Sequence, residues 1–199
     1  MHVAELHRRS VEGFAATLDA LAAEGADELW SRPTPCPDWD VLALVNHVVY
    51  EDLWTVPLME GATLDEIGDR FDGDLLGDDR ITRARAACDA AVVAASSGIV
   101  AGQTVHLSFG DAPAEEYARQ LAADHLIHGW DLAVAVGADT HLDPEVVEAC
   151  AAWFVDREDL YRDSGVIGPR PADVGDDADP QARLLVAFGR DPSWSPPGR

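Results

Sequence analysis

The fold is decided by a stretch in the second half of the chain, which reads Ala123-Asp124-His125-Leu126-Ile127-His128-Gly129-Trp130-Asp131. It lies within residues 114–136, a run that otherwise has the composition of a buried helix. Asp124 and His128 are four residues apart, so a helix would place both on one face, within an apolar stripe. Burying a carboxylate and an imidazole without partners is costly. We therefore expect a metal ion between them, with a further ligand from another helix.

The composition is that of an ordinary globular protein, except for its charge. Of the 199 residues, 47% are hydrophobic and 26% are charged, which fits about one domain spanning residues 1–199. The 37 Asp and Glu residues outnumber the 14 basic residues, all of them Arg, and the formal net charge is -23. Such a surface repels phosphate groups, so we expect neither a nucleic acid nor an anionic membrane as a partner.

No feature of the sequence points to export or membrane insertion. The cysteines Cys36, Cys88 and Cys150 are far apart, odd in number and without a CxxC spacing, as suits a reducing compartment. The first residues lack the apolar core of a signal peptide, and no stretch approaches the length of a transmembrane helix. These observations predict a cytoplasmic protein.

Apolar side chains at helical spacing predict a mainly helical chain. We expect helices over about residues 3–23, 41–59, 79–95, 114–136, 144–161 and 181–188. Prolines break the chain before the second helix, and Asp40 and Asp143 suit the N-caps of the second and fifth. Four long helices predict an all-α four-helix bundle with an extra helix packed outside it, together about residues 1–162, and an irregular C-terminal tail with a short helix, about residues 163–199.

The connections between these helices carry weaker signals. Residues 61–79, rich in Gly and Asp, predict an acidic connection with one short helical turn near Leu64–Ile67. Ser96-Ser97-Gly98 is expected to end the third helix, and the alternating residues 104–109 are expected to be extended. The run Gly110-Asp111-Ala112-Pro113 then predicts a turn into the fourth helix.

A candidate metal site combines His47 from the second predicted helix with Asp124 and His128 from the fourth. His47 stands at helical spacing in an apolar stripe, with Glu51 one turn further on. Helical bundles build metal sites from ligands on facing helices, including pairs one turn apart. Three protein ligands leave coordination positions for water or substrate, which is typical of a catalytic site.

Each of these side chains also has an interpretation without a metal. His47 could be a core histidine bonded to Glu51 or to a backbone carbonyl, and Asp124 with His128 could be an ion pair on a helix face. Glu51 could be a fourth ligand, a general base, a group that supports a ligand, or an exposed acid. Asp131 could orient a ligand or cap a neighbouring segment.

The remaining candidate residues are expected outside the site. His125 lies about a quarter turn off the site face and is expected to be an exposed neighbour. His106 and His141 fall in connections, so we expect them on the surface. Cys36 stands between two prolines, close to the start of the second helix, and we interpret it as a residue of a structural turn rather than as a nucleophile.

Three segments carry a resemblance to a known family. The first reads Pro33-Thr34-Pro35-Cys36-Pro37-Asp38-Trp39-Asp40-Val41 and continues with Leu44-Val45-Asn46-His47. The second reads Leu126-Ile127-His128-Gly129-Trp130-Asp131-Leu132-Ala133, and the third reads Leu184-Leu185-Val186-Ala187-Phe188-Gly189-Arg190-Asp191-Pro192. Together they resemble the N-terminal domain group of the mycothiol-dependent maleylpyruvate isomerases, in its small actinobacterial-type branch. That group belongs to the DinB-like metal-binding four-helix bundles, and the resemblance covers nearly the whole chain.

The resemblance implies a divalent metal, zinc or nickel, held by His47, Asp124 and His128. In the family the first member of the i, i+4 pair is usually Glu or His, so the shorter Asp124 is a departure. The isomerase that names the group has a further C-terminal α/β domain, for which this chain ends too early, so we do not carry over its isomerase activity. What the resemblance implies is a metal that binds and activates a small thiol such as mycothiol.

We therefore expect a metal-dependent enzyme of the thiol-transferase or isomerase-like type, which acts with a small-molecule thiol on a small electrophile. Glu51 or Asp131 would assist proton transfer as catalytic residues. Two alternatives keep the metal site, namely a non-catalytic stress or interaction module and a hydrolase that uses activated water. Apolar Ala and Val side chains on the later helices make a homodimer a further hypothesis.

Overall fold

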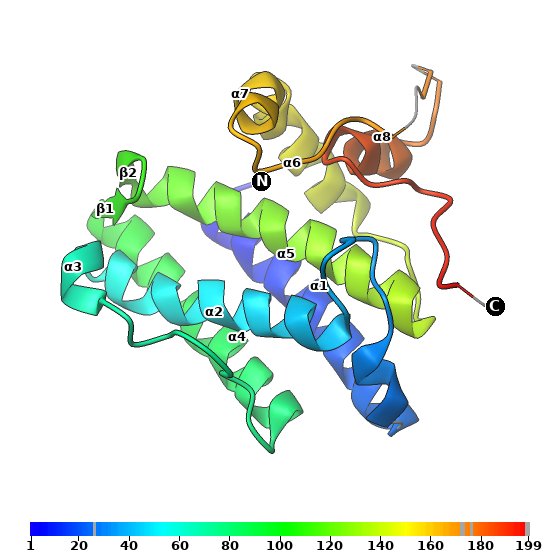
Figure 1. Cartoon of the computed structure of the whole chain (residues 1–199). Helices are drawn as coiled ribbons and strands as arrows, with labels where there is room; N and C mark the ends of the chain where they lie inside the picture. Colours follow the sequence, from blue (N-terminus) through cyan, green and yellow to red (C-terminus); the bar gives the residue numbers. More distant parts are fainter. Residues whose placement is uncertain (26, 172–173, 176, 198–199) are drawn as a thin grey trace.

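The computed structural model describes residues 1–25, 27–171, 174–175 and 177–197, and these residues are mainly helical (Figure 1). The elements, in chain order, are α1 (Val3–Glu24), the 3-10 helix η1 (Asp27–Ser31), α2 (Val41–Met59), α3 (Leu64–Ile67), α4 (Arg80–Ala101), β1 (Thr104–Leu107), β2 (Gly110–Pro113), α5 (Ala114–Val136), α6 (Pro144–Phe154), α7 (Glu158–Asp163) and α8 (Pro180–Ala187). The predicted N-caps are present, because Asp40 accepts a hydrogen bond from the Ala43 amide and Asp143 accepts one from the Glu145 amide.

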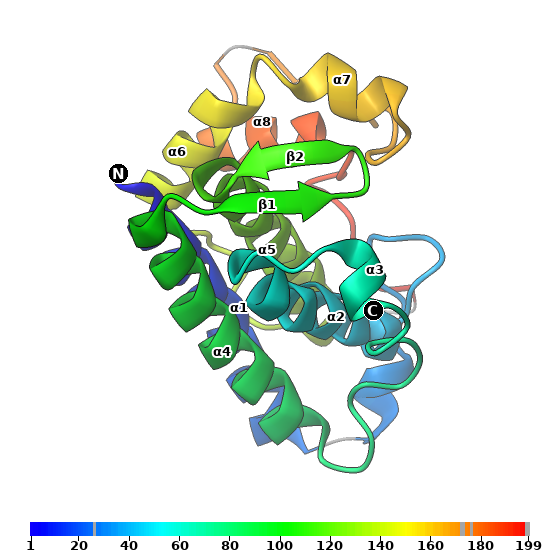
Figure 2. The same cartoon turned by 90° about the vertical axis from the view of Figure 1, so that its left-hand side faces the viewer.

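The four long helices α1, α2, α4 and α5 form the bundle. α1 packs along α5 and α4, while α2 packs along α4 and α5 (Figures 1 and 2). Each helix sends side chains that are at most 1% exposed into one core, among them Phe14, Leu18, Leu44, Cys88 and Leu132. Removing these apolar stripes from water is the main driving force for the assembly. The predicted all-α four-helix bundle is confirmed.

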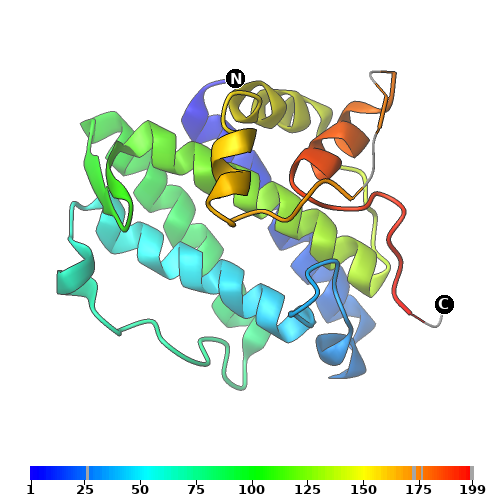
Figure 3. The same ribbon diagram turned by 45° about the horizontal axis from the view of Figure 1, so that its top comes forward.

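The later helices α6, α7 and α8 pack outside the bundle, along one side of α5 (Figure 3). A second hydrophobic cluster joins them to α5 and includes Leu126 and Trp130 of that helix. Within the cluster the rings of Phe154 and Phe188 stack with centroids 3.9 Å apart. Because α5 is covered by the bundle on one side and by this cluster on the other, it is buried along most of its length. The prediction that the fifth helix and the C-terminal segment lie outside the bundle is therefore confirmed.

The third long helix is longer than predicted. α4 continues to Ala101, so Ser96-Ser97-Gly98 does not end it. Gly98 instead lets α4 approach the end of α2, since a Cβ atom there would lie 2.8 Å from the Met59 sulfur. The helix ends at Gly102, whose φ of 63° is the left-handed conformation that glycine adopts easily at a helix C-terminus.

Two further expectations are corrected. The run Gly110-Asp111-Ala112-Pro113 is not a turn but strand β2, which pairs antiparallel with β1 and brings Val105 opposite Ala112 (Figure 2). The predicted helix over 144–161 is divided, because a turn closed by a hydrogen bond from the Arg157 amide to the Phe154 carbonyl separates α6 from α7. The turn brings Tyr161 edge-on against Phe154, with ring centroids 5.5 Å apart.

Among the described helices, α4 is the one that could cross a membrane by length and composition alone. Its buried positions are mostly small, and they are Ala84, Ala87, Cys88, Ala91, Ala95 and Gly98. These small side chains let α4 pack closely against α1 and α2 in the bundle, which accounts for part of its apolar character. A cytoplasmic location stays a prediction.

Candidate metal centre

The three predicted metal ligands come together where α2 lies beside α5 (Figure 3). The carboxylate Oδ1 of Asp124 lies 3.7 Å from Nε2 of His47 and 3.4 Å from Nε2 of His128. One donor atom from each of the three residues lies within 4.8 Å of the others. The spacing of four residues therefore places Asp124 and His128 on the same face of α5, as the sequence indicated, and α2 supplies His47 as the third side chain.

The donor set fits a divalent cation. Oδ2 of Asp124 is buried and has no hydrogen-bond partner among the described residues, which is costly for a carboxylate unless a cation compensates it. Burial alone would raise the pKa of Asp124, but the two neighbouring imidazoles hold it well below its usual range, so the group is ionised. Two imidazole nitrogens and one carboxylate oxygen suit zinc, nickel and other first-row metals.

The site is open on one side. The side chains of His47 and Asp124 are 25% and 28% exposed, whereas that of His128 is 8% exposed. A cation held by these three residues would keep coordination positions that small molecules can reach, as in catalytic rather than structural metal sites.

The orientation of the His128 ring is fixed by Asp131, on the side of the ring that faces away from the site. Its Nδ1 lies 3.0 Å from Oδ2 of Asp131, and because a carboxylate can only accept, Nδ1 carries the proton and Nε2 is left facing the site. Asp131 is itself completely buried and accepts hydrogen bonds from Arg190, at 3.1 Å to Oδ1 and 2.9 Å to Oδ2. Burial alone would raise the pKa of Asp131, but the hydrogen bond from His128 and the charge of Arg190 lower it. This geometry supports the role of orienting a ligand.

The proline-rich segment before α2 folds over the site in a turn that is closed by backbone hydrogen bonds, among them one from the Trp39 amide to the Cys36 carbonyl. The Thr34 side chain strengthens this turn, because its hydroxyl donates to the Trp39 carbonyl at 2.8 Å and accepts from the Cys36 amide at 3.1 Å. The turn sets the Trp39 ring against both imidazoles, with centroids 4.6 Å from His47 and 5.6 Å from His128. Trp39 thus forms one wall of the site.

The same turn brings Cys36 to the edge of the site, which the interpretation as a plain turn residue missed. Its sulfur lies 3.4 Å from Oδ2 of Asp131 and accepts a hydrogen bond from Nη2 of Arg190 at 3.1 Å. Cys36 and Arg190 are 154 residues apart in the chain, so no local pattern connects them. Arg190 lies in one of the segments that carry the family resemblance, which is the signal that could have pointed to it.

Glu51 lies one turn beyond His47 on α2, close to the site. Burial and the charge of Asp124 raise its pKa to about 7, although the nearby imidazole of His47 acts in the opposite direction. A carboxyl group that titrates near neutrality can both accept and donate a proton at physiological pH. A pKa near neutrality therefore suits Glu51 to the role of a general base, one of the roles considered for it from the sequence.

One histidine prediction is wrong and two are confirmed. His125 is not an exposed neighbour: it is completely buried, because α5 is covered on nearly every side and the face next to the site also points into the bundle. His106 and His141 are on the surface, with side chains 36% and 91% exposed, and each pairs with a nearby carboxylate.

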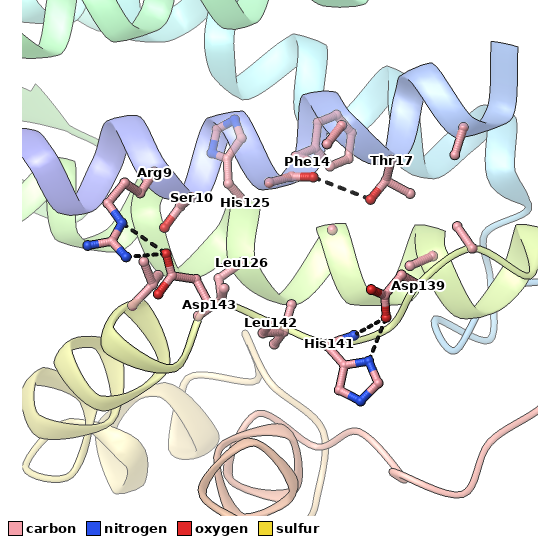
Figure 4. A pocket seen from close by; sticks show the side chains of 17 residues that line it. Arg9, Ser10, Phe14, Thr17, His125, Leu126, Asp139, His141, Leu142 and Asp143 are labelled. Carbon is pink, nitrogen blue, oxygen red and sulfur yellow. Dashed lines mark hydrogen bonds and ion pairs between the residues drawn. The ribbon is translucent and has the colours of Figure 1, made fainter. Parts of the chain in front are cut away.

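The structure also contains a cavity away from this centre (Figure 4). Its volume is about 280 Å³, and it is lined by α1, by α5 and by the loop that leads to α6. Arg9 and Asp143 form an ion pair at one end, and Asp139 and His141 are paired at the other (Figure 4). None of the three candidate metal ligands lines it, so it is separate from the candidate metal centre.

Comparisons with known proteins agree with the bundle and with the segments around the ligands. Residues 11–133 match the mycothiol maleylpyruvate isomerase N-terminal domain, and this span includes the three candidate ligands. Two uncharacterised proteins of Mycobacterium tuberculosis, from strains CDC 1551 / Oshkosh and ATCC 25618 / H37Rv, are each 35% identical over 151 residues, covering 73% of this chain and 74% of the relative. No solved structure gives a significant match. The chain belongs to the mycothiol maleylpyruvate isomerase N-terminal domain family.

Proposed function

We propose that this protein is a divalent-metal-dependent enzyme that binds a small thiol of the mycothiol type and directs its sulfur to a small electrophile, in a transferase or isomerase-like reaction. The observation that carries the proposal is the convergence of His47, Asp124 and His128 on one point that solvent can reach. Zinc or nickel is the metal that we expect there. Membership in a family named for a mycothiol-dependent isomerase supports a thiol as the ligand.

The residues around this point have separable tasks. When bound, the cation would lower the pKa of a coordinating thiol, so that the sulfur is available as a thiolate near neutral pH. Glu51, with its pKa near 7, would accept the proton that the thiol loses and return it to the product. Asp131 and Arg190 would hold His128 in the orientation that the cation requires. Trp39 would exclude water from one side of the site.

The test is a titration of cobalt-substituted protein with mycothiol, followed by visible absorption. Binding of the sulfur to the cation should change the cobalt spectrum, and the same thiol with its sulfur methylated should change it much less. His128→Ala should abolish the response, because it removes a ligand whose Nε2 faces the site. Glu51→Gln should keep the spectral response but lower turnover, since the amide cannot accept the thiol proton.

Other outcomes would point to the other functions that such a centre could serve. No spectral change with mycothiol would refute the thiol proposal. Release of product from esters or amides without any thiol would identify a hydrolase instead. Metal binding without turnover in either assay would identify a non-catalytic metal-binding module.

A further inference from the structure

A second group of potential ligands lies inside the bundle, apart from the open metal centre. It consists of Asp52 from α2, Cys88 from α4 and His125 from α5, and one donor atom from each lies within 4.8 Å of the others. All three residues are buried, with exposures of 0%, 1% and 0%. Figure 4 shows His125 rising from α5 toward α1. The rings of His125 and His7 are nearly perpendicular, with centroids 5.8 Å apart.

The hydrogen bonding of His125 leaves one nitrogen as a donor atom for a cation. Its Nδ1 lies 2.8 Å from the Leu121 carbonyl oxygen, and because a carbonyl only accepts, Nδ1 carries the proton. In the neutral imidazole, Nε2 is then an unprotonated nitrogen, and it faces Oδ1 of Asp52 at 3.0 Å. Histidines that bind metals in proteins commonly donate their other N–H to a backbone carbonyl in this way.

The same group contains polar atoms that nothing in the described chain satisfies. Both carboxylate oxygens of Asp52 and Nε2 of His125 are buried without an aligned hydrogen-bond partner, although Oδ1 and Nε2 are close in distance. A buried carboxylate without donors is costly, and such groups in native proteins are normally paired or bound to a metal. Without a cation, an imidazolium on His125 would compensate one of the two oxygens, and the Cys88 thiol beside Asp52 is only a weak donor to the other. A cation between the three side chains would compensate both oxygens and the nitrogen.

We propose that Asp52, Cys88 and His125 form a second, closed binding site for a divalent cation such as zinc. One carboxylate, one thiolate and one neutral imidazole together balance the two positive charges of the ion, so that the loaded site would be neutral inside the core. Sulfur and nitrogen donors with a single carboxylate are a donor set that zinc accepts. The site is enclosed and joins α2, α4 and α5, so its role is structural: it ties three helices of the bundle together.

The test uses cobalt-substituted protein without any added thiol. A thiolate ligand gives a sulfur-to-cobalt charge-transfer band, which the open centre with its two imidazoles and one carboxylate cannot give. We expect this band in the wild type and its loss in Cys88→Ser, together with loss of about one metal ion per chain. Cys150→Ser is the matched control, since Cys150 is also completely buried but belongs to no group of potential ligands in the described part of the chain. It should keep both the band and the metal content.

Two further variants separate this site from the open centre. His128→Ala should lose the open centre and keep the band, so the two proposals can fail independently. Cys36→Ser should also keep the band, because the proposed thiolate ligand is Cys88. Loss of the band in Cys36→Ser would instead place the thiolate at the open centre, beside Arg190. Absence of the band in the wild type, or its persistence in Cys88→Ser, would overturn the proposal. If Cys88→Ser does not fold, X-ray absorption of the zinc-loaded wild type decides: a sulfur neighbour that persists in Cys36→Ser supports the site, and its absence refutes it.

Discussion

Replacement of Asp131 by Asn should both destabilise the protein and weaken its metal centre. Asp131 is 0% exposed, and its partner Arg190 is 15% exposed, so the pair lies almost entirely inside the structure. Asn has the same shape, but it carries no charge, and its amide group would turn a donor toward either Arg190 or His128, both of which also donate. The substitution therefore leaves a buried guanidinium without its counter-charge.

The expected cost follows from this geometry. Removing one partner of a buried ion pair costs roughly 3–5 kcal/mol. Arg190 keeps its hydrogen bond to the Phe188 carbonyl and remains partly exposed, so we expect the lower end, about 3 kcal/mol. Because Asp131 also fixes the orientation of His128, metal affinity should fall by about 10–100-fold.

Urea unfolding of the metal-free protein measures the first effect, and competition with a chromophoric chelator measures the second. Asp111→Asn is the control, since Asp111 pairs with His106 at the surface and should contribute below about 1 kcal/mol. The pKa of Asp131 is lowered in the folded state, so the difference between Asp131→Asn and wild type should shrink as the pH falls through that pKa. A cost equal to that of Asp111→Asn at neutral pH would refute the reasoning.

Three further predictions address packing, protonation and the turn before α2. Gly98→Ala should destabilise the protein by about 1–3 kcal/mol, because its Cβ would meet the Met59 sulfur at 2.8 Å. A Cβ atom at Gly13 would have no neighbouring atom within 4 Å, so Gly13→Ala should stabilise the protein by up to about 1 kcal/mol. Thermal unfolding compares the two variants, and a Gly98→Ala protein more stable than Gly13→Ala would contradict the packing. The pKa of Glu51 is raised from 4.5 to about 7, so metal-free wild type should lose stability as the pH rises between these values. Glu51→Gln should be more stable than wild type above about pH 7 and no more stable near pH 4. Urea unfolding at several pH values measures this, and a stability difference that does not change with pH would argue against the raised pKa of Glu51. Thr34→Ala, which removes the two side-chain hydrogen bonds within the turn, should cost about 1–3 kcal/mol in urea unfolding, whereas Thr34→Ser should cost less.

Local patterns in the sequence were enough to predict most of the helices and to single out the candidate ligands. Apolar periodicity and the N-caps Asp40 and Asp143 depend only on neighbouring residues, because a helix closes its hydrogen bonds within four residues. The pairing of Asp124 with His128 has the same origin, since residues four apart share a helix face. His47 was added because it stands at helical spacing on another apolar stripe. Joining His47 to that pair assumed that the second and fourth predicted helices face each other, and only the structure shows that α2 lies beside α5.

Tertiary packing decided what surrounds that centre. Arg190 reaches Asp131 and Cys36 only because the segment after α8 returns to α5, and no spacing in the sequence encodes that contact. The burial of His125 was also beyond a local argument, because a face of a helix is inward or outward according to its neighbours, and α5 has neighbours on nearly every side. Its meeting with Asp52 and Cys88 depends on how three helices pack together, which the order of residues along any one of them does not show. The sequence by itself determined which residues share a helix face, whereas the tertiary structure decided which of those faces meet.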